Sequence, residues 1–112
     1  MDLNNVVLSG RLFDIGVNES RMGYPVVEAR LAVHIGKDKE GNDLYDEFRV
    51  RSYGKKSVFI STLKEGTYVV IEAVAKEDIR VNGSDPNTTR SVTYFNIQKI
   101  KTVGMTKGDL DD

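Results

Sequence analysis

Alternating apolar and polar residues dominate the chain and predict half-buried β-strands. In residues 5–13, Val6, Leu8 and Leu12 share one face, with an interruption at Gly10. The alternation returns in residues 26–35, whose apolar face consists of Val27, Ala29, Leu31, Val33 and Ile35. The polar segment 14–25 contains two glycines and is predicted to be a loop.

A charged turn is predicted to join two of the strands. Residues 36–42 are charged and contain a Gly-Asn turn signal, and apolar residues return in segment 44–53. Short connections of this composition join antiparallel strands. Segments 26–35 and 44–53 are therefore predicted to form a β-hairpin.

The second half of the chain predicts one helix and two further strands. Residues 57–63 carry apolar side chains at helical spacing and are followed by Gly66. β-branched and aromatic residues predict strands over 67–75 and 90–100, separated by a turn-rich loop at 81–87.

The predicted order is three strands, a short helix and two strands. Five short strands with one helix between the third and the fourth describe an all-β, five-stranded OB-fold barrel, which binds oligonucleotides over its second and third strands. We expect this domain to occupy residues 1–103. Residues 104–112 form a short acidic end that we expect to be disordered.

Length and composition limit the class of protein. The chain has 112 residues, enough for one core and too few for two. It contains no Cys, which excludes disulfides and fits a reducing compartment. The sequence has neither a bilayer-spanning apolar stretch nor a signal-peptide pattern. We therefore expect a cytoplasmic protein with no membrane partner.

The residues of common active sites are missing from the sequence. There is one histidine, His34, and no HExxH, GxSxG, GxxxxGKS/T or GxGxxG motif. Asp46 and Glu47 are adjacent carboxylates, but neighbouring strand residues point to opposite faces, which favours solvated charges over acid–base catalysis. We expect a protein that is not an enzyme, with no catalytic residue, no metal site and no cofactor.

One predicted strand combines cationic and aromatic side chains on a single face. Its period of two places Phe48 and Val50 on one face. The other face carries Arg49, Arg51 and Tyr53. Guanidinium groups attract phosphates, and a ring offers a surface on which a base can stack. An ordinary exposed strand, with the tyrosine covering the core, explains this pattern equally well.

Other side chains could extend this surface. The net charge of −1 and the pI near 5.8 argue against a protein that is basic as a whole, but salt screening allows a local basic strip to attract phosphate. The further candidates for nucleic-acid binding are Arg11, Tyr24, Arg30, His34, Lys37, Lys55, Lys56, Arg80 and Arg90. A surface or packing role is the alternative for each. Tyr94 and Phe95 have opposite parity, so one of them is expected in the core.

Several blocks of sequence resemble the bacterial and phage single-stranded DNA-binding protein family. NNVVLSGRL at residues 4–12 resembles the family's first strand, ARLAV at 29–33 its second, and FRVRSYGKK at 48–56 its third. LKEG at 63–66 and VIE at 70–72 follow in the family's order. The resemblance rests on the order and spacing of these blocks, because each block alone is a weak signal.

The resemblance covers residues 4–100 and carries several implications. It implies an OB fold, binding of single-stranded DNA without sequence preference, protection of that DNA during replication, recombination or repair, and assembly into a homodimer or homotetramer through the first strand. Tyr53 matches the family's aromatic residue before a Gly-Lys pair. Glu47 stands where an aromatic residue is common, and the chain has no Trp, which implies weaker and more electrostatic binding.

The end of the chain differs from the family's long linker and acidic tip. Its last residues are Asp109, Leu110, Asp111 and Asp112, without a terminal Phe. These residues are candidates for contacts with replication or recombination proteins, and the short end resembles phage or plasmid versions of the family. Two alternatives stay open: an OB adaptor of the primosome type, and an OB domain used only for protein–protein interaction.

Overall fold

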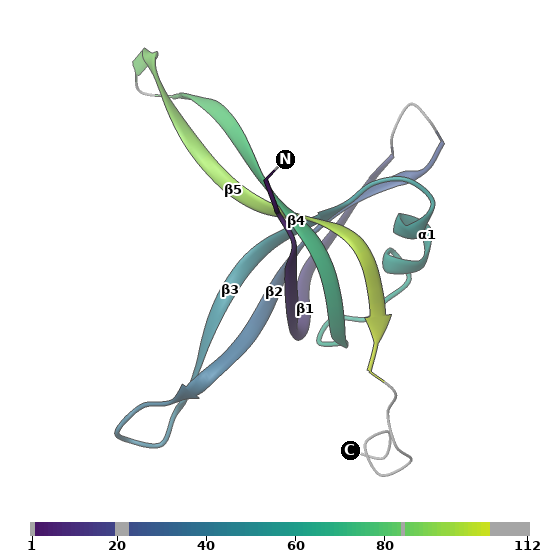
Figure 1. Ribbon diagram of the computed structural model, residues 1–112, viewed down its shortest axis with the longest axis vertical. Helices are drawn as coiled ribbons and strands as arrows, with labels where there is room; N and C mark the ends of the chain where they lie inside the picture. Colours follow the sequence, from purple (N-terminus) through teal and green to yellow (C-terminus); the bar gives the residue numbers. More distant parts are fainter. Residues whose placement is uncertain (1, 20–22, 84, 104–112) are drawn as a thin grey trace.

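The computed structural model describes residues 2–19, 23–83 and 85–103. In this part of the chain the elements are β1 (Val6–Glu19), β2 (Pro25–Lys37), β3 (Asp43–Ser52), α1 (Lys56–Ile60), β4 (Tyr68–Asn82) and β5 (Asp85–Thr102). The strands form a closed barrel in the order β1-β2-β3-β5-β4, with β3 and β5 parallel and the other pairs antiparallel (Figure 1). The predicted five-stranded OB barrel, with a short helix between its third and fourth strands, is confirmed.

β1 pairs with two strands in turn. Its first part, from Val6 to Arg11, pairs with β4, and its second part pairs with β2. Near this change, a Cβ added at Gly10 would lie 2.2 Å from the backbone oxygen of Ala32. The two backbones approach too closely for a side chain, which explains the glycine that interrupts the apolar alternation.

A bulge carries β1 beyond its predicted end. The register with β2 shifts near Asp14, whose φ is 54°. The Glu65 carboxylate accepts hydrogen bonds from the backbone N–H of Asp14 (2.8 Å) and of Ile15 (3.0 Å), which satisfies donors that the bulge removes from the ladder. Residues 14–19, predicted as part of a loop, therefore continue the strand, because backbone pairing with β2 supplies what their polar side chains do not.

β2 and β3 form a long hairpin, as predicted. Each residue from Val27 to His34 faces a partner on β3. A register shift between His34 and Gly36 interrupts the alternation. As a result Ile35, which the sequence places on the apolar face, is 55% exposed.

β4 and β5 form a second long hairpin, where the sequence predicts a loop at residues 81–87. β4 runs to Asn82 and β5 begins at Asp85, so the turn is much shorter than predicted. The pairing of Val81 with Thr89 shows the cause, because β-branched residues stabilise strands even when the neighbouring residues favour turns. Figure 1 shows that the two hairpins extend beyond the barrel and diverge from each other.

α1 is shorter than the predicted segment 57–63. After Ile60 the chain continues in turns, in which the backbone N–H of Leu63 donates to the Ile60 carbonyl (3.1 Å). The buried hydroxyls of Ser52 and Ser57 lie 2.7 Å apart and connect the end of β3 to the helix. Across the described ranges, no helix is long and apolar enough to cross a membrane.

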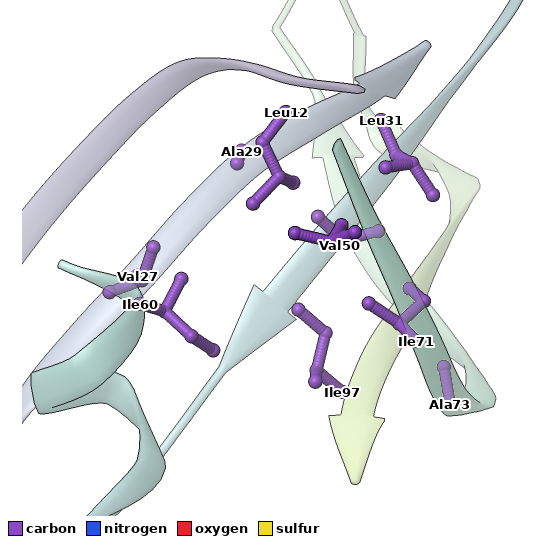
Figure 2. Packing of buried hydrophobic residues seen from close by; sticks show 10 residues of the cluster. Leu12, Val27, Ala29, Leu31, Val50, Ile60, Ile71, Ala73 and Ile97 are labelled. Atoms are coloured by element: carbon purple, nitrogen blue, oxygen red, sulfur yellow. The ribbon is translucent and has the colours of Figure 1, made fainter. Parts of the chain in front are cut away.

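Every strand and the helix contribute to one aliphatic core (Figure 2). Its buried residues are Leu12, Val27, Ala29, Leu31, Val50, Ile60, Val69, Ile71, Ala73 and Ile97. Full burial of a Leu, Ile or Val side chain stabilises a fold by about 1.5–3 kcal/mol. The barrel is therefore a packed support, and its outward side chains are the place to look for a binding site.

Candidate nucleic-acid interface

The outer face of β2 and β3 brings the predicted arginines together. Arg30 on β2 lies directly opposite Arg49 on β3, and Glu28 lies opposite Arg51. Val50, between the two arginines of β3, is buried, so the predicted division of this strand into core and outer faces is confirmed.

Arg30 and Arg49 have different electrostatic surroundings. Arg30 Nε lies 3.7 Å from Asp14 Oδ2, and Arg30 Nη1 lies 3.4 Å from Glu47 Oε2. Arg49 is exposed, and its side chain makes no ion pair or hydrogen bond with any residue that the structure describes. Exposed ion pairs contribute at most about 1 kcal/mol, so a phosphate could displace the carboxylates of Arg30 and bind Arg49 directly.

Arg51 is the most enclosed arginine of this face. Its side chain is 13% exposed, its Nε lies 3.2 Å from Glu28 Oε1, and its Nη2 lies 3.6 Å from Asp78 Oδ2. Its Cζ lies 4.0 Å from the centre of the Tyr94 ring, within cation–π distance. Burial lowers the pKa of Arg51, but its hydrogen bond with Tyr53 and the nearby charge of Glu28 outweigh burial, so the pKa is raised overall.

Tyr53 follows β3 directly and is 39% exposed. Partial burial raises the pKa of its phenol; a hydrogen bond with Arg51 opposes that rise, and one with Tyr94 adds to it. The ordinary pKa of tyrosine is about 10, so the phenol is neutral at pH 7. Its partly open ring offers a face on which a base can stack.

An open depression of about 320 Å³ runs along the same face. It is lined by Asp14, Gly16, Asn18, Glu28, Ala29, Arg30, Arg49, Val50 and Arg51. Polar and charged groups of both signs dominate this lining. The depression suits a charged chain with many hydrogen-bonding groups better than an apolar ligand.

His34 lies farther out on the β2–β3 hairpin and is already engaged. Its Nε2 lies 3.1 Å from Asp43 Oδ1, and its ring meets that of Tyr45 edge to face, with centres 5.4 Å apart. The Tyr45 ring is the more accessible surface for a base at this end of the hairpin, because Tyr45 is 54% exposed.

Tyr45 and the acidic partners of the arginines were not among the predicted site residues. Tyr45 shares strand parity with Arg49 and Tyr53, and Glu28 shares parity with Arg30, so this signal could have identified both. Asp78 carried no such signal, because it comes from a distant strand. Phe95 packs against the core and Tyr94 contacts Arg51, which agrees with the expectation that one of the two is a core residue.

Arg11 lies opposite Ala32 of β2 and lines a second depression with Tyr45 and Glu47, while Lys55 and Lys56 lie at the start of α1. Arg11 Nη1 donates to the Gly66 carbonyl (2.9 Å), and its guanidinium lies over the Tyr68 ring. Lys55 precedes α1 and is exposed, and Lys56 Nζ donates to the backbone carbonyl of Tyr53 (3.0 Å).

The last candidates lie at loops and hairpin ends. Tyr24 precedes β2, Lys37 ends it, and Arg90 is exposed on β5 opposite Arg80. The side chain of Arg80 lies outside the described part of the chain, as do Asp109, Leu110, Asp111 and Asp112. Among the side chains that the structure describes, no group of three or more His, Asp or Glu residues could hold a metal ion.

The barrel defines an OB-fold protein, and comparison with solved structures supports this class. The chain is similar to a small single-stranded DNA-binding protein from Streptomyces coelicolor, with a TM-score of 0.69 and 21% identity over 92% of this chain and 96% of that one. It is also similar to the protein PriB from Ralstonia solanacearum, with a TM-score of 0.64 and 13% identity over 91% of this chain and 100% of that one. No protein-family model and no curated protein sequence matches the chain. At the level of the fold, the resemblance found in the sequence is confirmed.

Proposed function

We propose that this protein binds single-stranded DNA, without marked sequence preference, through the outer face of β2 and β3 and the adjoining β4–β5 hairpin. The observation that carries the proposal is the pairing of Arg30 with Arg49 on the outer face of an OB barrel, with the partly exposed Tyr53 directly after β3. Binding is stoichiometric, with no chemical step. The similarity to the Streptomyces coelicolor single-stranded DNA-binding protein supports the same assignment.

Each part of this face has a separate role in the proposed mechanism. The guanidinium groups of Arg30 and Arg49 bind phosphates, which are common to every sequence. The ring of Tyr53 stacks on a base, and every base has a face that allows this. Bases in a duplex are already stacked on their neighbours, so this face favours single strands.

Carboxylates beside the arginines moderate the affinity. Asp14 and Glu47 lie within ion-pair distance of Arg30, and a phosphate must compete with them. We therefore propose binding that is weaker than on an uninterrupted basic surface and that falls steeply as salt rises.

The free edge of β1 supports self-association into a homodimer or homotetramer. Residues 6–9 pair with β4 on one side, and on the other side they pair with no strand of the described chain. Val7 on this segment is 60% exposed. An apolar strand edge of this kind invites pairing with a second copy.

We further propose that this assembly protects single strands during replication, recombination or repair. The acidic residues 109–112 would then contact other proteins of these processes. This part of the proposal rests on the sequence resemblance.

Titration of a labelled oligo-dT tests the proposed function. We expect saturable binding at about 50 mM salt, a loss of affinity of at least tenfold by about 200 mM, and much weaker binding to a duplex of equal length. A duplex bound as tightly as the single strand, or no binding to any oligonucleotide at the lower salt, contradicts the proposal.

An adaptor of the primosome type is a second candidate. The acidic residues Asp14, Glu28 and Glu47 along the face favour it, because they suit contact with a basic protein as well as with DNA. In this case the oligonucleotide should bind weakly alone and tightly once a partner protein is present. An interaction-only OB domain should bind no oligonucleotide under either condition.

A further inference from the structure

We propose that Arg51 is a positioning residue, which connects β4 and β5 to β2 and β3 and so fixes the angle between the two hairpins, and which does not itself bind phosphate. The geometric part of the proposal concerns the free protein. Its effect on DNA binding rests on the proposed function above.

The contacts of Arg51 span four strands. From β3 its guanidinium reaches Glu28 on β2 (3.2 Å), Asp78 on β4 (3.6 Å) and the ring of Tyr94 on β5 (4.0 Å). The planar guanidinium can serve all three at once, because it donates along its edges and stacks through its face. One side chain thus connects the two hairpins.

These contacts lie where the barrel has least backbone support. β3 and β5 are joined by two register pairs, Val50 with Phe95 and Arg51 with Asn96. The other neighbouring strands share six or more pairs each. Two register pairs between β3 and β5 leave the angle between the two long hairpins poorly fixed by the backbone. Side-chain contacts beside this β3–β5 pairing must therefore contribute.

The surroundings of Arg51 also argue against a phosphate contact. Its side chain is 13% exposed and already faces two carboxylates, whereas Arg49 on the same face is exposed and free of ion pairs among the described residues. Withdrawing Arg51 toward a phosphate would break its ion pairs with Glu28 and Asp78 and its contact with the Tyr94 ring. Arg49 can bind a phosphate without breaking an ion pair to any described residue.

The consequence for binding follows from the two tyrosines beside Arg51. The Arg51 guanidinium lies 4.0 Å from the centre of the Tyr94 ring, and Tyr53 follows Arg51 by two residues at the end of β3, so the placement of both rings depends on how Arg51 is held. A stacking ring contributes only when it lies in line with the phosphate contacts. Arg51 therefore acts on affinity through the placement of Tyr53 and Tyr94.

Two substitutions that keep the charge give the first test. Lysine cannot donate in a fork and stack at once, so we expect Arg51→Lys to weaken oligo-dT binding about tenfold, the scale of one lost stack, with an unchanged salt dependence. The matched change Arg49→Lys should weaken binding by a clearly smaller factor than Arg51→Lys, because lysine keeps the charge of a phosphate contact and loses only the fork. Equal affinity for both variants overturns the proposal.

Two carboxylates with nearly equal side-chain exposure, 54% for Glu28 and 56% for Glu47, give a second test. Each pairs with one arginine of this face. Glu47→Gln releases Arg30 and should strengthen binding about twofold, as expected for an exposed pair. Glu28→Gln loosens Arg51 and should weaken binding, although it also removes a negative charge. If both variants strengthen binding alike, Arg51 binds phosphate and the positioning role is wrong.

Hydrogen exchange without DNA separates this proposal from the proposed function. Amides of the β4–β5 hairpin should exchange faster in Arg51→Lys than in Arg49→Lys or the wild type, while the core of β2 stays protected in all three. Unchanged exchange in the hairpin overturns the positioning role, whatever the binding data show. Faster exchange, combined with a wild type that binds no oligonucleotide, supports the positioning role and overturns the function.

Discussion

At the scale of single residues, Tyr53 is the side chain through which base stacking can be measured most directly. Its ring is partly open and directly follows the strand that carries Arg49 and Arg51. We expect Tyr53→Ala to cost about 1–3 kcal/mol of binding free energy with little change in salt dependence, because stacking releases no counterions. Oligo-dT titrations at several salt concentrations measure both quantities.

Tyr53→Phe is the matched control, because it keeps the ring and loses the hydroxyl. We expect it to bind more tightly than Tyr53→Ala and nearly as tightly as the wild type, because stacking uses the face of the ring and not the hydroxyl. A Tyr53→Ala protein that melts early but binds normally when folded would show that this ring covers the barrel and does not stack.

Arg49 supports a simple electrostatic prediction at the same scale. Replacing it with Met removes an exposed charge and little else, so we expect the plot of log affinity against log salt to flatten by about one unit, as for one released counterion. The melting temperature should not change. An unaltered slope would mean that the phosphate backbone passes elsewhere, with Lys55 and Arg90 as the next exposed cations to test.

At the scale of the strand, the bulge in β1 depends on one distant carboxylate. Glu65 accepts hydrogen bonds from the backbone of Asp14 and Ile15 and so fixes the segment that presents Asp14 to Arg30. Glu65→Gln puts an amide donor where one acceptor oxygen is needed. We expect a loss of about 1–2 kcal/mol in the free energy of unfolding, measured by urea denaturation.

Glu40→Gln is a suitable control for Glu65→Gln, because Glu40 is exposed in the β2–β3 turn. The Glu40→Gln protein should have the same free energy of unfolding as the wild type. If Glu65→Gln is as stable as the wild type, the backbone of the bulge is stable without the carboxylate, and its two hydrogen bonds contribute little.

The strands that bury one face are the part of the fold that the sequence could predict. In β2 the residues Val27, Ala29 and Leu31 alternate with exposed ones, and the local pattern determines the structure. The extension of β1 could not be predicted, because residues 16–19 are held by backbone pairing with β2 that their own side chains do not signal. In β4, the turn-forming residues after Val81 obscured the strand preference of that β-branched residue.

In the candidate site, too, the sequence predicts the local pattern along a strand and not the contacts between distant segments. Parity along β3 correctly separated Arg49, Arg51 and Tyr53 from the buried Val50. The different surroundings of the two arginines come from Asp78 and Tyr94, which are neighbours only after the barrel closes. Such contacts between distant segments leave no periodic trace in one sequence.

At the scale of the whole molecule, the open edge of β1 predicts a change in assembly. Val7 lies on this edge opposite Glu72 of β4. A charge at an intermolecular strand contact is unfavourable, so we expect Val7→Glu to dissociate the proposed oligomer while the barrel remains folded. Sedimentation at micromolar concentration measures the change, and Val7→Thr, which keeps the β-branched shape, should retain the assembly. A wild type that is already a monomer refutes this prediction and leaves the binding face unaffected.

The short pairing between β3 and β5, which closes the barrel, also has a consequence for the protein during its synthesis. Synthesis proceeds from the N-terminus, so β1, β2 and β3 leave the ribosome first, while Asp78 and Tyr94 follow with the last two strands. Arg51 lacks Asp78 until β4 has emerged and Tyr94 until β5 has emerged, and without β5 the sheet has no closing strand. We expect a nascent chain of any shorter length to be unable to hold DNA, so that the capacity to bind is gained in one late step of synthesis.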